Sequence, residues 1–206
     1  MTVPPLLRRP AVWLGAALAV VVGGWWLWPT LSGHDAVNDV LVVGDGDLAT
    51  AKVPVERRLR ERGLAVVDDL SAASWCEAAT LLPDLIARFR PETVVVSFRA
   101  NGDCADGVGE VRRLVPGARH LVLVVQPGPG RMDEAVRNAI GAAAAEGVSV
   151  ADATALLGGD EMPPAVGCAW WDDCGPDGAI AVRDDTGELT EAGGERIARV
   201  LAGVVP

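Results

Sequence analysis

The chain has 206 residues and a formal net charge of −10. This length accommodates one domain with a substantial core and leaves little room for a second. The acidic balance excludes nucleic acid as a partner, because phosphate binding needs clustered cations.

The first predicted element is a membrane-spanning helix. Arg8 and Arg9 precede an uncharged apolar stretch that is long enough to cross a ~30 Å hydrocarbon layer. The stretch ends in tryptophans, which are typical of membrane interfaces, whereas a cleaved signal peptide, the alternative, ends in small residues. Because the arginines keep their end in the cytoplasm, we expect a single-pass protein of the cell membrane. Its parts are a cytoplasmic N-terminus at 1–10, a signal-anchor helix at 11–29, a linker at 30–38 and an extracytoplasmic domain at 39–206.

Five valine-rich runs predict the buried strands of a parallel sheet. They are continuous rather than alternating, and they occupy 40–44, 64–68, 93–98, 120–126 and 147–152. Helical patterns lie between and after them, at 53–63, 74–90, 107–115, 132–147 and from Thr190 onward. The alternation predicts an α/β fold in which helices cover both faces of a five-stranded sheet. The ligand site of such a sheet lies beyond the carboxyl ends of its strands.

The four cysteines predict two disulfides, because an even number outside the membrane is typical of paired cysteines. Three pairings are open. The loops after the second and third strands should approach the same rim, which favours Cys76 with Cys104 and leaves Cys168 with Cys174. A zinc site is the alternative, but the cysteine spacings lack the close pairs of zinc modules, and we expect no metal.

The turn after the first strand, "GDGDLA" at 44–49, fits the dinucleotide-binding pattern G-x-G-x-x-A. Asp68 and Asp69 follow at the end of the second strand, where such a site places an acidic residue. A Rossmann-like dinucleotide-binding domain is therefore one alternative. However, Asp45 and Asp47 would place carboxylates beside the pyrophosphate, and a nicotinamide cofactor is not expected outside the membrane. We expect no cofactor.

From the first strand to the C-terminus, the sequence also resembles the SGNH/GDSL hydrolases. The first block of that family is a strand followed by Gly-Asp-Ser, and "VLVVGDG" at 40–46 is similar to it, with Gly46 in place of the nucleophilic serine. The third block, Gly-x-Asn-Asp, is similar to "RANG" at 99–102. Asn101 there matches the asparagine that helps bind the oxyanion, and Arg99 replaces the glycine.

The last block, Asp-x-x-His followed by Leu-Thr, is similar to "DTGELT" at 185–190. Asp185 matches the aspartate, and Glu188 stands in place of the histidine. The resemblance implies a flavodoxin-like three-layer fold and a family activity of acyl-ester cleavage. Because Gly46 and Glu188 replace the nucleophile and the base, we expect a catalytically inactive domain that binds a cell-envelope glycan or a membrane protein. An esterase acting on envelope carbohydrate or lipid through a non-standard site is the alternative.

Two groups of side chains are candidates for ligand binding. Acidic residues should converge at the carboxyl rim of the sheet, where they could bind a divalent cation or simply contact water: Asp45, Asp47, Asp103, Asp185 and Glu188. Arg99 and Asn101 follow the third strand at the same rim. The second group is Trp170 and Trp171, in the loop "WWDDCGPDG", where exposed tryptophans could line a sugar-binding groove.

Overall fold

The computed structural model describes residues 38–98, 104–115, 117, 119–126 and 132–206. Five parallel strands form its main sheet in the order β2-β1-β3-β4-β5. Their bounds are β1 Val40–Gly44, β2 Val66–Asp69, β3 Thr93–Ser97, β4 His120–Val125 and β5 Ser149–Asp152. Each strand lies within two residues of the predicted bounds. Every residue of β1 and β3 is buried, as their uninterrupted valine runs require of strands covered on both faces.

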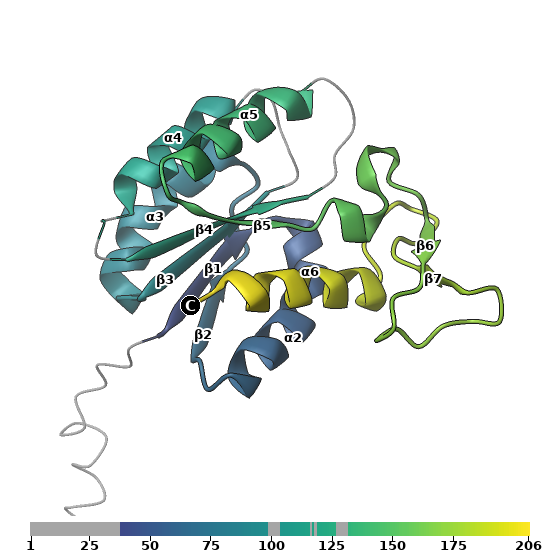
Figure 1. Cartoon of the computed structure of the whole chain (residues 1–206). Helices are drawn as coiled ribbons and strands as arrows, with labels where there is room; N and C mark the ends of the chain where they lie inside the picture. The colour runs from purple at the N-terminus through teal and green to yellow at the C-terminus, as the bar shows by residue number, and fades with distance from the viewer. Residues whose placement is uncertain (1–37, 99–103, 116, 118, 127–131) are drawn as a thin grey trace, which may run out of the picture. The chain divides into compact units, whose positions relative to one another are not determined.

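Helices cover both faces of this sheet (Figure 1). On one face α3 (Trp75–Phe89), α4 (Ala105–Leu114) and α5 (Met132–Ala145) bury a core that includes Trp75, Leu82 and Val108. On the other, α2 (Gly46–Glu61) and α6 (Glu191–Val204) bury a second core that includes Leu48, Leu59 and Ile197. The predicted α/β fold with three layers is confirmed.

The helix starts follow capping side chains. Ser74 accepts a hydrogen bond from the Glu77 amide at 3.2 Å, and Thr190 accepts one from the Gly193 amide at 3.2 Å. Helix α2 begins at Gly46, whereas the pattern predicted a start near Val53. The reason is Asp45, whose carboxylate caps the helix, and the buried row that continues from it, Leu48, Ala51, Val55 and Leu59.

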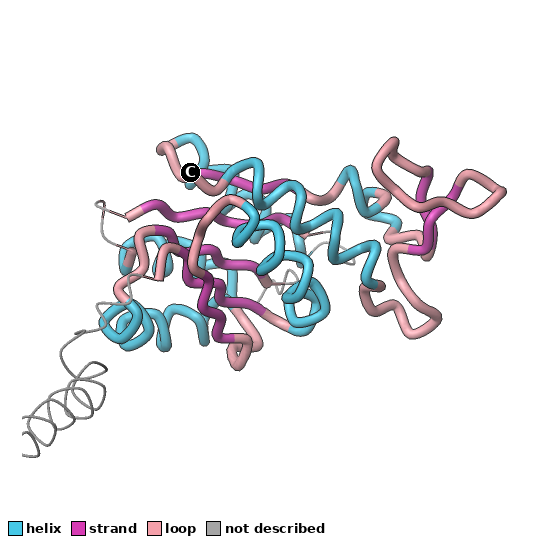
Figure 2. The backbone as a smooth tube through the Cα atoms, turned by 90° about the horizontal axis from the view of Figure 1, so that it is seen from below, coloured by secondary structure: helices cyan, strands magenta, loops and turns pink. Residues whose placement is uncertain are grey.

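The segment between β5 and α6 was not predicted as regular structure. It contains two 3₁₀ turns, Ala155–Leu157 and Gly159–Glu161, and an antiparallel hairpin of β6 (Ala165–Gly167) and β7 (Ala179–Ala181). Figure 2 shows this hairpin and its loops projecting beyond the start of α6. The three-residue strands are too short to give a period-two signal in the sequence.

The far end of α6 is tied to the end of α2. The Arg62 guanidinium donates hydrogen bonds to the carbonyl oxygens of Ala202 and Val205, each at 2.6 Å. The C-terminus therefore lies at the edge of the sheet where the strands begin (Figure 1). Within the described ranges, no helix is both long and apolar enough to cross a membrane. The anchor predicted at 11–29 lies outside the described residues.

Candidate functional site

The order of the strands reverses between β1 and β3, and this is where an open parallel sheet usually binds its ligand. Gly44 is paired with Ser97 at the carboxyl ends of these strands. The Asp45 amide donates a hydrogen bond to the Ser97 carbonyl at 3.2 Å. A Cβ on Gly44 would lie 2.5 Å from that carbonyl oxygen and 2.6 Å from a Leu48 methyl group. The turn after β1 therefore requires glycine at this position.

Gly46, which the sequence resemblance matches to the hydrolase serine, is the first residue of α2. Asp45 precedes it as the cap, and its carboxylate accepts a hydrogen bond from the Asp47 amide at 3.2 Å. Glycine offers no oxygen or sulfur atom that could attack an acyl group. Asp45 is half-buried and acts on the helix start, where negative charge is favoured by the exposed amides and the helix dipole.

Asp47 is turned into the protein. It is only 6% exposed, and its carboxylate faces Arg183, itself 3% exposed, with Nη2 and Oδ2 3.8 Å apart. Arg183 also donates from Nη1 to the Gly187 carbonyl at 2.8 Å. This buried ion pair joins the first turn of α2 to the segment that precedes α6, which is the segment that resembles the last block of the hydrolases.

That last segment forms a tight turn closed by a bridge between Arg183 and Leu189. The Asp184 carboxylate accepts hydrogen bonds from the Thr186 amide and the Glu188 amide, each at 2.9 Å, and from the Thr186 hydroxyl at 2.7 Å. The hydrogen bond from the Thr186 hydroxyl is the main reason that the pKa of Asp184 lies below its ordinary value. Asp185 and Glu188, which the sequence resemblance matches to the aspartate and the histidine of the last block, are exposed in this turn.

Two buried polar residues at the same edge were missed by the sequence analysis. Ser97 ends β3 and Gln126 follows β4, and the Gln126 amide donates to the Ser97 hydroxyl. Their exposed fractions are 0% and 3%. Each of these polar residues stands at the end of a valine-rich run, and this position could have identified them in the sequence as candidates for the site. Arg99, Asn101 and Asp103, which follow β3, lie outside the described residues.

The two carboxylates that end β2, those of Asp68 and Asp69, each accept a hydrogen bond from a nearby group. Asp68 accepts from the Lys52 ammonium at 3.1 Å, and this hydrogen bond is the main cause that raises the pKa of Lys52. Asp69 accepts from the Ser71 amide at 3.0 Å. The space bordered by Lys52, Asp68 and Leu70 measures about 10 Å³. That is room for about one water molecule.

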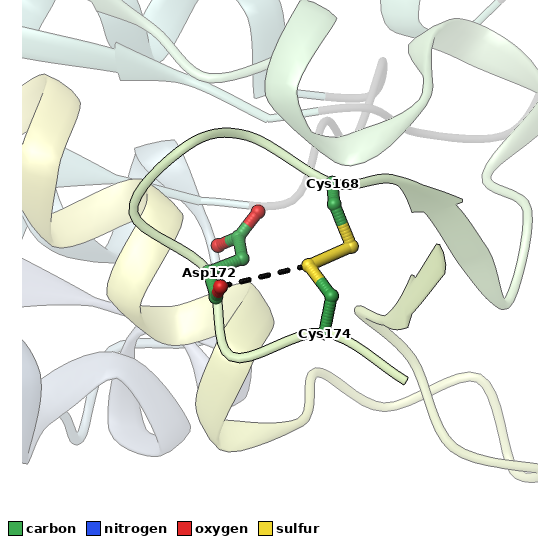
Figure 3. A group of neighbouring side chains, drawn as sticks. All are labelled: Cys168, Asp172 and Cys174. Atoms are coloured by element: carbon green, nitrogen blue, oxygen red, sulfur yellow. Dashed lines mark hydrogen bonds between the residues drawn. A yellow bond between two sulfur atoms is a disulfide. The ribbon is translucent and has the colours of Figure 1, made fainter. Parts of the chain in front are cut away.

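Both expected disulfides are present. Cys76 at the start of α3 is joined to Cys104, which precedes α4, with 5.5 Å between their Cα atoms. The second disulfide joins Cys168 to Cys174, with 6.3 Å between Cα atoms, and closes a loop around Asp172 (Figure 3). Cys168, Asp172 and Cys174 lie close enough together to suggest a metal site. Disulfide sulfurs are not thiolates, however, so this group lacks the sulfur ligands that zinc requires.

The two candidate tryptophans lie within this closed loop. Trp170 is 89% exposed, whereas Trp171 is half-buried. The two rings meet nearly perpendicular, with centroids 5.5 Å apart. Trp171 also packs against the Arg199 guanidinium of α6, which lies 5.0 Å from the ring centroid. The structure therefore places Trp171 against the body of the domain and Trp170 in solvent.

No protein-family model matches the chain, and no curated protein sequence matches it. Solved structures do. The C-terminal catalytic domain of peptidoglycan O-acetyltransferase A from Streptococcus pneumoniae, determined with a methylsulfonyl adduct, is 18% identical with a TM-score of 0.55, covering 82% of this chain and 92% of that one.

Two further structures have the same arrangement. A GDSL-like lipase from Bacteroides thetaiotaomicron is 9% identical with a TM-score of 0.58, over 82% of this chain and 88% of its own. A family 3 carbohydrate esterase from Clostridium thermocellum is 13% identical with a TM-score of 0.51, over 80% and 93%. These likenesses, with the sheet order β2-β1-β3-β4-β5, show that the chain has an SGNH-hydrolase-like fold.

Proposed function

We propose that this protein is a membrane-anchored, extracytoplasmic domain that binds a cell-envelope glycan or membrane protein and does not hydrolyse esters. The observation that carries the proposal is the first turn of α2. Its first residue is Gly46, which the sequence resemblance matches to the attacking serine, and the next carboxylate, Asp47, is buried against Arg183.

Acyl transfer by a serine hydrolase needs a nucleophile, a base beside it and donors for the oxyanion. Gly46 has no side chain that could attack. Glu188 is exposed in the turn before α6, and a carboxylate near a developing oxyanion would repel it. An attack by Asp47 would break its ion pair and form an anhydride. The substitutions therefore remove the nucleophile and the imidazole together.

Two features support a location outside the cytoplasm. The arginines before the apolar stretch at 11–29 favour a cytoplasmic N-terminus, and all four cysteines are paired, as is typical of oxidising compartments. One of the structural neighbours is a peptidoglycan O-acetyltransferase domain, which acts on an envelope polymer. A glycan or membrane protein of the envelope is accordingly the kind of ligand that we propose.

The test uses the full chain in a polyoxyethylene detergent. The protein is assayed with p-nitrophenyl acetate and butyrate, and it is then incubated with methanesulfonyl fluoride and weighed by intact-mass spectrometry. We expect no turnover and no added methylsulfonyl group, while an SGNH esterase treated in parallel shows both. Turnover that disappears in Glu188→Gln, a substitution at an exposed position that leaves the fold intact, would overturn the proposal.

A further inference from the structure

The loop that carries Trp170 is built on a buried ion pair. Arg196 of α6 is 3% exposed, and its guanidinium is paired with the Asp172 carboxylate. The same guanidinium donates to the carbonyls of Leu156 at 2.7 Å and Gly167 at 3.0 Å. These contacts fix the base of the loop to α6, to the 3₁₀ turn Ala155–Leu157 and to the end of β6.

Two more constraints close the loop around this base. The Asp172 carboxylate accepts a hydrogen bond from the Ala169 amide at 2.7 Å, and the disulfide joins Cys168 to Cys174 (Figure 3). The conformation of 168–174 is thus set before any ligand arrives, which lowers the entropy lost on binding.

Within this fixed loop, Trp171 packs against the domain, whereas Trp170 is exposed to solvent. Arg199 and the edge of the neighbouring indole hold Trp171, whereas Trp170 is 89% exposed. Among the described residues, the other large hydrophobic side chain that is exposed is Val53 on α2, at 68%. The closed loop thus holds an exposed indole in a fixed position, which lowers the cost of ordering it against a ligand.

The surroundings of Trp170 favour a sugar over a protein as the ligand. A protein interface has an apolar core of several side chains. Here the exposed segment 173–178 follows Asp172, whose side chain is buried, and the charged side chains of this segment are the carboxylates of Asp173 and Asp177. A pyranose has an apolar C–H face that can stack on one indole, and its hydroxyl groups donate hydrogen bonds to carboxylates and backbone carbonyls.

We infer that the loop 168–174 is a glycan-binding platform, in which the Trp170 indole stacks on the C–H face of a pyranose. The carboxylates of Asp173 and Asp177 accept hydrogen bonds from the sugar and repel anionic groups. The ligand is therefore an uncharged or amino-bearing polysaccharide rather than a carboxylated one. This inference names the ligand class of the proposed function and rests on it.

The experiment is calorimetric titration of the full chain, in a detergent without sugar head groups, with three oligosaccharides of equal length. The oligosaccharides are N-acetylated chito-oligosaccharide, its amino form and oligogalacturonate. We expect the first two to bind and the third to fail. Trp170→Ala lowers the affinity by about tenfold or more, since truncating a central tryptophan anchor has an effect of this size. Trp170→Phe retains part of the affinity.

Val53→Ala is the matched control, because Val53 is also an exposed apolar residue, and it should bind like the parent. Equal affinity of Trp170→Ala and the parent overturns the inference, as does failure of the folded parent to bind any of the three oligosaccharides. A membrane protein captured through Trp170 in the absence of glycan binding would overturn it in favour of a protein partner.

Ester turnover is measured on the same samples. If the protein hydrolyses esters and also binds glycan through Trp170, then the proposal that it lacks catalysis is wrong, and the proposed glycan platform is supported. No turnover with no glycan binding overturns only the platform. The two failures are therefore distinguishable.

Discussion

The carboxylate of Asp47 lies 3.8 Å from the guanidinium of Arg183, and both side chains are almost fully withdrawn from solvent. One follows the first strand and the other precedes the last helix. The pair therefore links the two segments that resemble the first and last blocks of the SGNH hydrolases. In this protein their connection is an ion pair with a structural role.

Removing the cation of this pair should destabilise the protein strongly. In Arg183→Leu the buried Asp47 carboxylate loses the guanidinium that faces it. We expect the free energy of unfolding to fall by about 3–5 kcal/mol, measured by urea denaturation. The double variant Asp47→Leu/Arg183→Leu should recover much of this loss, because it removes both charges from the interior.

Lys52→Gln is the control for this prediction. The Lys52 side chain is 43% exposed and that of its partner Asp68 is 20% exposed. Loss of an ion pair with a solvent-exposed member has little effect on stability. If Arg183→Leu and Lys52→Gln destabilise the protein equally, then the Asp47–Arg183 pair does not have the role assigned to it.

Gly44→Ala should destabilise the turn after β1. The added methyl group would lie 2.5 Å from the Ser97 carbonyl oxygen, which is fixed by the sheet. We expect a loss of about 1–3 kcal/mol in thermal or urea unfolding. Gly109→Ala is the opposite case, because the exposed Gly109 lies within α4 with nothing within 4 Å of the new methyl group. That variant should gain about 0.5–1 kcal/mol from helix propensity.

The two disulfides should differ in their contribution to stability. Cys76 and Cys104 are 28 residues apart in sequence, whereas Cys168 and Cys174 are 6 apart. Because closure of a longer loop restricts the unfolded chain more, Cys76→Ser/Cys104→Ser should cost about 3.5 kcal/mol and Cys168→Ser/Cys174→Ser about 2.5 kcal/mol. Urea denaturation of both variants checks the order, and the reverse order would contradict the entropic explanation.

The stability of the folded protein should depend on pH through Asp184, in the turn before α6. Its pKa is lowered by the hydrogen bonds it accepts, that of the Thr186 hydroxyl first, so the folded state binds its proton less tightly than the unfolded state. The stabilisation is complete above the ordinary carboxyl value of 3.8 and is lost as the pH falls through the lower folded value. Asp184→Asn keeps an oxygen acceptor and removes the charge.

The parent should therefore unfold at a higher temperature than Asp184→Asn at neutral pH, and the difference should vanish well below pH 3.8. Thermal unfolding of both proteins across this range is the measurement. A difference that stays constant down to the lowest pH would show that the charge of Asp184 has no part in the stability of the turn.

Local signals in the sequence predicted the layers of the fold but not its buried charges. The valine runs at 40–44 and 93–97 and the caps Ser74 and Thr190 act over a few residues, and these elements were predicted within two residues. Arginine is mostly a surface residue, yet Arg183 and Arg196 are each 3% exposed. Their burial depends on Asp47 and Asp172, which lie far from them along the chain, and such partners have no local pattern.

Only part of the candidate site could likewise be predicted from the sequence. The absence of a nucleophile at Gly46 and the pairing of the cysteines follow from residue identity and strand order. The inward turn of Asp47 and the buried contact between Ser97 and Gln126 do not, because both depend on the three-dimensional meeting of chain segments. The different exposure of Trp170 and Trp171, adjacent in sequence, is set by Arg199 on a later helix.

The hydrogen bond from Arg62 to the Val205 carbonyl fixes the place of the C-terminus, where a tether can be attached. It holds the last residues beside the start of the sheet, whereas the tryptophan loop lies near the opposite end of α6, beside Arg196. A tether or fluorescent reporter fused after Pro206 is therefore attached far from that loop. If the protein is attached to a biosensor surface through this end, Trp170 lies far from the attachment point and can contact polysaccharides in the solution.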